Sequence, residues 1–66
     1  MPVIDVSLLA GRRPEVLHAL QVALHDAAVA ALDVPPGSVR VLLREVPPTH
    51  WTVGGVTVAQ RRAGQD

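Results

Sequence analysis

Hydrophobic and polar positions alternate at the start of the chain. Ile4, Val6 and Leu8 alternate with Val3, Asp5 and Ser7. This two-residue period is typical of a β-strand with one apolar face. We expect the strand to span residues 2–9.

A longer spacing begins at Pro14 and predicts a helix over residues 14–32. Proline suits the first helical position, although Arg13 before it offers no side-chain acceptor for an N-cap. The apolar face carries Leu17, Leu20, Leu24, Ala28 and Ala31. The otherwise polar side also carries Val22, Val29 and Leu32. We expect part of that side to contact another subunit, because three apolar residues exposed together on a helix are typical of an interaction surface.

Two prolines and a glycine in residues 33–38 end the helix, and a second strand is predicted over residues 38–46. Strand, helix and strand at these lengths form an α/β fold made of a single βαβ unit, with parallel strands and a right-handed crossover. One helix can cover only one side of the sheet. The other side, which carries Arg40 and Leu42, must therefore be covered from outside this chain.

The last part of the chain, residues 47–62, is expected to form a loop and a short edge segment. Residues 56–59 alternate and could pair as an edge strand or arm, and the polar tail from Gln60 to Asp66 is expected to fray. We find no internal repeat. Residues 1–66 are expected to form one domain.

The size of the chain limits its core. A domain of 66 residues buries only about 60% of the surface that its unfolded chain exposes. The absence of cysteine excludes disulfides and thiolate metal sites, and the spacing of the three histidines matches no common metal motif. Oligomerisation remains as the way to supplement the core.

The charge balance excludes several classes of partner. Six arginines offset six acidic residues, so the net charge of zero gives no electrostatic footprint for nucleic acid or an anionic membrane. No apolar run approaches the roughly 20 residues of a membrane span, and the start lacks the regions of a signal peptide. We expect a soluble, cytoplasmic protein without nucleic-acid or membrane partners.

Pro2 carries the candidate chemistry. An initiator Met followed by a small residue is normally removed, which would leave the Pro2 nitrogen as a free secondary amine. Desolvation and nearby cations lower the pKa of such an amine, so that it could act at neutral pH as a general base or a nucleophile. A proline at the start of a strand also has a purely structural interpretation.

Arg12, Arg40 and Trp51 complete the set of candidate site residues. Alone, each also has a structural interpretation. Arg12 could be a solvated turn residue, and Arg40 a strand residue whose aliphatic stem packs on the protein while its charged head stays in water. Trp51 could be a loop aromatic that fills the edge of the core. Arginine also suits an oxyanion site, because it stays cationic and grips an oxoacid with two parallel hydrogen bonds.

Together these residues resemble the 4-oxalocrotonate tautomerase family. The resemblance runs from Pro2 to about Arg62 and includes the motif Pro2-Val3-Ile4, the turn Gly11-Arg12, and the segments 38–41 and 50–55. It implies trimers of dimers, or hexamers, in which paired subunits join their sheets into four-stranded ones and share their sites. It implies no cofactor and no metal.

The resemblance also implies roles for the candidate residues. Pro2 would be the catalytic base. Arg40 would bind the 2-oxo or hydroxyl oxygen and the adjacent carboxylate, and Arg12 would hold the distal carboxylate. Trp51 would replace the family's usual phenylalanine and keep the pocket apolar.

The leading hypothesis is therefore a cofactor-free isomerase of 2-hydroxy or 2-oxo unsaturated dicarboxylates such as 2-hydroxymuconate. A decarboxylating or promiscuous relative that uses Pro2 as a cation or an imine-forming nucleophile is a second possibility. From a different class, the chain could be a non-catalytic oligomerisation module, or the inactive subunit of a heterohexamer with an active paralogue. Removal of Met1 discriminates between these classes, because Pro2 is an amide while Met1 is attached.

Overall fold

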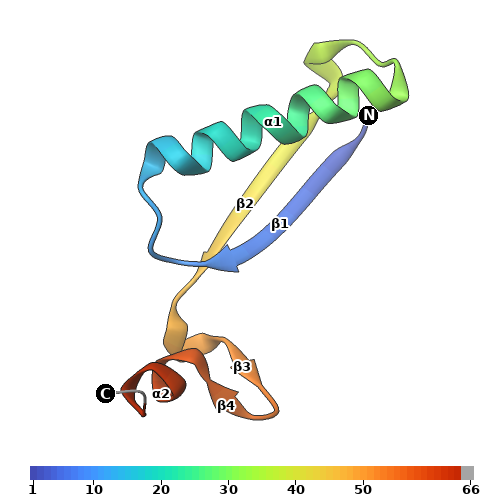
Figure 1. Cartoon of the computed structure of the whole chain (residues 1–66). Coiled ribbons are helices and arrows are strands. Elements are labelled where there is room, and N and C mark those ends of the chain that lie inside the picture. The colour runs from blue at the N-terminus through green and yellow to red at the C-terminus, as the bar shows by residue number, and fades with distance from the viewer. Residues whose placement is uncertain (65–66) are drawn as a thin grey trace.

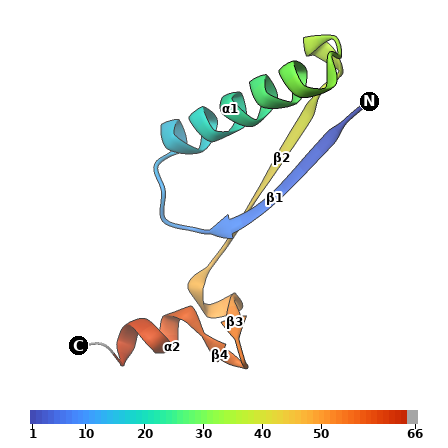
Figure 2. The same ribbon diagram turned by 45° about the vertical axis from the view of Figure 1, so that its right-hand side comes forward.

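Two parallel strands and one helix form the main body of the molecule. The computed structural model describes residues 1–64. Strands β1 (Val3–Leu9) and β2 (Arg40–Val46) pair in parallel, with Val3 opposite Arg40 at one end and Leu9 opposite Val46 at the other. Helix α1 (Pro14–Leu32) connects them and lies over one face of the sheet (Figures 1 and 2). The predicted α/β fold with a single βαβ unit is confirmed.

The ends of α1 follow the local sequence. Arg13 occupies the N-cap position without a side-chain cap bond, as expected, and its Nε lies 3.2 Å from Oε1 of Glu15. At the other end Asp33 adopts a left-handed conformation with φ of 54°, and its N–H donates to Val29 O at 3.0 Å. This geometry stops the helix just before the proline pair.

The second strand begins later than the predicted residue 38. Ser38 belongs to a short 3₁₀ turn, η1 (Pro36–Ser38). Its N–H and its hydroxyl both donate to Pro35 O, at 2.9 and 2.7 Å. These bonds keep Ser38 out of the sheet, so that β2 begins at Arg40.

The end of the chain differs from the prediction. After η2 (Pro48–His50), strands β3 (Thr52–Val53) and β4 (Val56–Thr57) pair with each other as a hairpin, and no pairing to β1 or β2 is seen within residues 1–64. Gly54 and Gly55, with φ of 60° and 82°, form the tight turn between them.

A short helix, α2 (Val58–Ala63), replaces the expected frayed tail. Thr57 and Gln60 form a capping box: Gln60 N donates to Thr57 Oγ1 at 3.0 Å, and Thr57 N donates to Gln60 Oε1 at 2.8 Å. The expected short strand is found at Val56–Thr57, which pair with β3. Residues 58–59 are helical instead of continuing that strand, and the expectation of a frayed tail is wrong over residues 60–63. The part of that expectation that concerned residues 65–66 lies outside the described residues.

The single chain does not enclose a core. Within residues 1–64, Val39 alone is buried, while Ile4, Val6, Leu8, Leu17, Leu20, Leu24 and Leu43 are half-buried between α1 and the sheet. The radius of gyration is 15.5 Å, whereas a compact chain of this length has about 11 Å. The accessible surface is 4765 Å², compared with about 4,000 Å² for a folded monomer of this mass.

The face of the sheet opposite α1 is open. Its apolar residues Val3 and Leu42 are 59% and 47% exposed, and they alternate with charged or polar side chains. This is the side that the sequence predicts to be covered from outside the chain. The chain itself leaves this side uncovered, and its covering by another copy stays a prediction.

Helix α1 contradicts the expectation that no segment is long and apolar enough to span a membrane. It is 19 residues long and contains a stretch of 18 residues with a mean hydropathy of 1.2, so it passes that test by length and composition. The sequence expectation needs correction on this point. The test is also passed by core helices of soluble proteins, and α1 places Leu17, Leu20 and Leu24 against the sheet.

Candidate functional site

Pro2 and Arg40 lie together at one end of the strand pair. The backbone N–H of Arg40 donates to Pro2 O at 3.0 Å, one residue before the paired register begins. Pro2 is half-buried, and Met1, which is attached to it, is 81% exposed. Removal of the exposed Met1 would therefore bare a Pro2 nitrogen that the strand already fixes in place.

The turn before β2 holds the side chain of Arg40. Nη1 of Arg40 donates to Gly37 O at 2.7 Å and more weakly to Val39 O at 3.4 Å. Within residues 1–64 no carboxylate pairs with this guanidinium. Its charge is therefore available to an anionic ligand.

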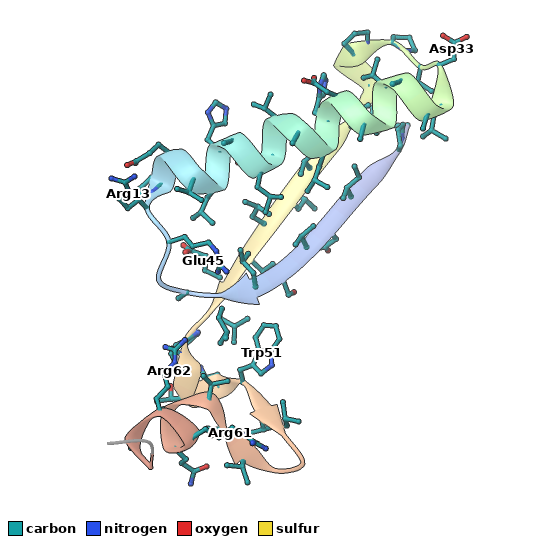
Figure 3. All side chains as sticks on the ribbon, in the orientation of Figure 1. Arg13, Asp33, Glu45, Trp51, Arg61 and Arg62 are labelled. Atoms are coloured by element: carbon teal, nitrogen blue, oxygen red, sulfur yellow. The ribbon has the colours of Figure 1, made fainter. Side chains whose placement is uncertain are left out.

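Arg12 and Trp51 lie at the opposite end. Arg12 follows β1 in the turn at Gly11, where φ is 136°, and its Nη1 donates to Leu9 O at 3.3 Å. Trp51 follows β2 and η2, and Figure 3 shows it beside the end of the strands that lies away from the N-terminus. Its carbonyl accepts from Val58 N at 2.9 Å, which ties α2 to the hairpin.

One chain therefore separates the four candidates into two pairs. Strand β1 runs from Val3 to Leu9, and six residue steps of about 3.3 Å each span about 20 Å. Pro2 and Arg40 stand at the start of that distance, and Arg12 and Trp51 stand beyond its end. The roles expected of the four residues require groups from different copies if they are to meet on one small molecule.

Arg44 lies on the open face but is not free. Its Nε and Nη2 donate to Oδ1 and Oδ2 of Asp5, each at 3.0 Å, in a two-bond pair across the strands. The hydrogen bond from Arg44 lowers the pKa of Asp5, and the same bond raises the pKa of Arg44. The Asp5 carboxylate therefore offsets the charge that Arg44 brings to this face.

An open groove of about 410 Å³ lies elsewhere, between α1 and the free edge of β2. It is lined by His18, Gln21, Val22, His25, Val39 and Val41, and by none of the four candidate residues. The groove contains neither the Pro2 amine nor an arginine. Within residues 1–64 no cluster of three His, Asp or Glu residues could hold a metal ion.

Two side chains of α1 make contacts that the helical pattern did not predict. Gln21 Nε2 donates to Val41 O at 3.3 Å, and His25 Nε2 lies 2.9 Å from Pro36 O. Both residues fall outside the apolar face that the helical spacing predicts. Their sequence positions carry no signal for these bonds, which depend on where the strand and the turn come to lie beside α1.

The family model described as tautomerase enzyme matches residues 2–61. The chain belongs to the tautomerase family. The match covers β1, α1, β2 and most of the C-terminal hairpin and helix, so that both ends of the strand pair lie inside it.

Two relatives match this tautomerase-family chain over most of their own length. It is 52% identical over 56 residues to a probable tautomerase of Ralstonia nicotianae, which covers 85% of this chain and 80% of that protein. It is 36% identical over 55 residues to a 2-hydroxymuconate tautomerase of Stutzerimonas stutzeri, covering 83% of this chain and 87% of that one.

Solved structures agree with the fold. TomN, a 4-oxalocrotonate tautomerase homologue in the tomaymycin biosynthetic pathway, superposes with a TM-score of 0.92 at 48% identity, over 98% of this chain and all of that one. A heterohexameric 4-oxalocrotonate tautomerase of Chloroflexus aurantiacus superposes with a TM-score of 0.86, also at 48% identity, over 91% of this chain and 97% of that one. The resemblance to 4-oxalocrotonate tautomerases is confirmed.

Proposed function

We propose that this protein is a cofactor-free tautomerase that moves a proton within 2-hydroxy or 2-oxo unsaturated carboxylates and dicarboxylates such as 2-hydroxymuconate. The observation that carries the proposal is the position of Pro2 beside Arg40 in a chain of the tautomerase family. The relative from Stutzerimonas stutzeri, named a 2-hydroxymuconate tautomerase, supports the choice of substrate.

Pro2 would act as the general base once Met1 is removed. Its nitrogen accepts the proton of the substrate's 2-hydroxyl group, and the resulting ammonium returns that proton to a carbon of the conjugated chain. The double bonds shift, the hydroxyl becomes a carbonyl, and no atom is gained or lost. A nearby guanidinium and partial desolvation both disfavour the ammonium, so they help to keep the amine neutral and basic.

The two arginines would divide the binding of the substrate. Arg40 stabilises the negative charge that develops on the 2-oxygen and binds the neighbouring carboxylate. Arg12 binds the distal carboxylate, and Trp51 supplies an apolar wall. Because Arg12 and Trp51 lie at the far end of their own chain, this division requires other copies.

An assembly with shared sites is part of the proposal. β1 has β2 on one side only, so its other edge is open for pairing. Antiparallel pairing of two such edges would give a four-stranded sheet and bring the Arg12 end of one copy beside the Pro2 end of the other. We propose a homohexamer built as a trimer of dimers, with a heterohexamer containing a paralogue as the alternative. The heterohexameric relative supports an assembly of this size.

The intact mass of the purified protein, followed by an ultraviolet assay of 2-hydroxymuconate ketonisation on the same sample, tests the proposal. A mass without Met1 together with turnover is the expected result. Absence of turnover in a sample that has lost Met1 would contradict it. Retained Met1 without turnover would favour a non-catalytic oligomerisation module or an inactive partner subunit.

A further inference from the structure

His25 connects α1 to the turn that precedes β2. Its Nε2 lies 2.9 Å from Pro36 O, and its Nδ1 lies 3.0 Å from Oδ1 of Asp26. A carbonyl oxygen can only accept a hydrogen bond, so Nε2 must carry the proton that is shared with Pro36. The imidazole therefore donates from the helix to the turn.

The Asp26 contact favours the doubly protonated ring. With Nε2 donating to Pro36, Nδ1 can donate to the carboxylate only if it also carries a proton. The hydrogen bond to Asp26 and then the bond to Pro36 raise the pKa of His25. Protonation thus strengthens the hold on the turn but is not required for the Pro36 bond.

The same turn holds the guanidinium of Arg40. Gly37 O, one residue after the carbonyl that binds His25, accepts from Arg40 Nη1 at 2.7 Å. Apart from His25, Pro36 O accepts only a long bond from Val39 N at 3.4 Å in the described part of the chain. No neighbouring atom lies within 4 Å of a Cβ built on Gly37, so side-chain packing does not constrain the chain at this position.

We propose that His25 is a positioning residue for Arg40. By fixing the Pro36 carbonyl it sets the orientation of the next carbonyl, at Gly37, and through it the place where Arg40 presents its charge to the substrate. This inference rests on the proposed role of Arg40 in the tautomerase reaction. It adds to the site a residue of α1, from the groove beside β2, that touches neither substrate nor base.

Two substitutions of His25 distinguish the contribution of the Nε2 bond to Pro36 from that of the Nδ1 bond to Asp26. Gln can place its amide N–H where Nε2 stands, whereas Asn reaches only the position of Nδ1. We expect His25→Asn to lower kcat about tenfold, because a small misplacement of a binding group is costly in an active site. His25→Gln should restore kcat to within about twofold of the wild type, with KM changing less than kcat in both variants.

A double variant tests whether the effect passes through Arg40. In an Arg40→Ala background, His25→Asn should cause no further loss of kcat, because the group that it positions is gone. His18→Asn, on the same groove, is the matched control and should keep wild-type kinetics. Equal impairment of the Gln and Asn variants, or a full tenfold loss in the Arg40→Ala background, would overturn the proposal.

A measurement that does not depend on activity separates this inference from the proposed function. Proton exchange at the Arg40 guanidinium, followed by NMR, should be faster in His25→Asn than in the wild type or in His25→Gln. Unchanged exchange would refute the positioning role. Wild-type activity of Arg40→Ala with accelerated exchange in His25→Asn would instead refute the catalytic role of Arg40 and leave the structural link in place.

Discussion

The two ends of the β1–β2 pair are built differently. At the Pro2 end, the turn η1 and the imidazole of His25 fix the segment that carries Arg40, so this end is organised within one chain. At the other end, the one hydrogen bond of the Arg12 side chain among the described residues goes to Leu9 O of the preceding strand, and Trp51 lies just before β3, beyond the sheet. One end of the chain thus presents a formed half-site. The other presents Arg12 and Trp51, which under the proposed function would reach a substrate only through another copy.

Replacement of Pro2 tests the formed half-site and should have the largest effect. In Pro2→Ala the rigid secondary amine is replaced by a flexible primary one, and we expect ketonisation to fall by roughly 10²–10⁴-fold, the usual contribution of a positioned base. Initial rates with 2-hydroxymuconate, on protein whose mass shows that Met1 is removed, provide the measurement. Rates equal to the wild type would remove Pro2 from the mechanism.

Mixing two impaired variants then tests whether the ends come from different copies. Pro2→Ala chains retain Arg12, and Arg12→Ala chains retain Pro2, so a mixed pair contains one intact site. After denaturation and joint refolding, we expect recovery of about a quarter of the wild-type sites from random pairing in twofold dimers. Activity no greater than that of the separately refolded variants would mean that each site lies within one chain.

The two arginines should differ in the kinetic constant that they control. Arg40→Ala should lower kcat by about 10- to 100-fold, because it removes a charge that stabilises the developing oxyanion. Arg12→Ala should raise KM with a smaller change in kcat, because a distal carboxylate is bound alike in ground and transition states. Steady-state kinetics of both variants measure the difference, and a reversed pattern would exchange the proposed roles.

A charge on the open face should disturb assembly rather than chemistry. Leu42, 47% exposed in the single chain, would be covered in the proposed oligomer, so Leu42→Asp should shift the protein towards smaller species. Sedimentation velocity measures the shift, with Thr49→Asp outside the sheet as the control. An unchanged hexamer would mean that Leu42 stays in solvent and that the four-stranded arrangement covers other residues.

The smallest expected effect concerns the Asp5–Arg44 pair. Because the folded pKa of Asp5 lies below its unfolded value, the pair stabilises the fold above the unfolded pKa of about 3.9. That stabilisation is lost as the pH falls through the folded pKa. Urea midpoints should therefore favour the wild type over Asp5→Asn at pH 7, and the difference should vanish under strongly acidic conditions. Glu45→Gln is the control, and a difference independent of pH would exclude the ion pair as its cause.

The βαβ unit could be predicted because its signals are local. Alternation in β1 and helical spacing after Pro14 each report which face of an element is apolar. The C-terminal helix was missed although Thr57 and Gln60 have the spacing of a capping box, a signal that the alternation of residues 56–59 obscured. The hairpin likewise follows from Gly54 and Gly55 once they are considered as a turn.

The site was predictable only in part. Parallel pairing places Pro2 beside Arg40, so their neighbourhood follows from the predicted strands. The bonds from Gln21 and His25 were not predictable, because they depend on the angle at which α1 crosses β2 and on the path of η1. The separation of Arg12 and Trp51 from Pro2 follows from the length of β1, which spans about 20 Å.

Within residues 1–64 the single chain buries almost no side chains, so its stability would depend on protein concentration if it folds only by associating. If folding and association are one reaction, the law of mass action applies, and the denaturation midpoint rises with total protein. Diluting the enzyme would then reduce its specific activity without any change of sequence or solvent. The rate of reactivation after unfolding would depend on how often two chains collide.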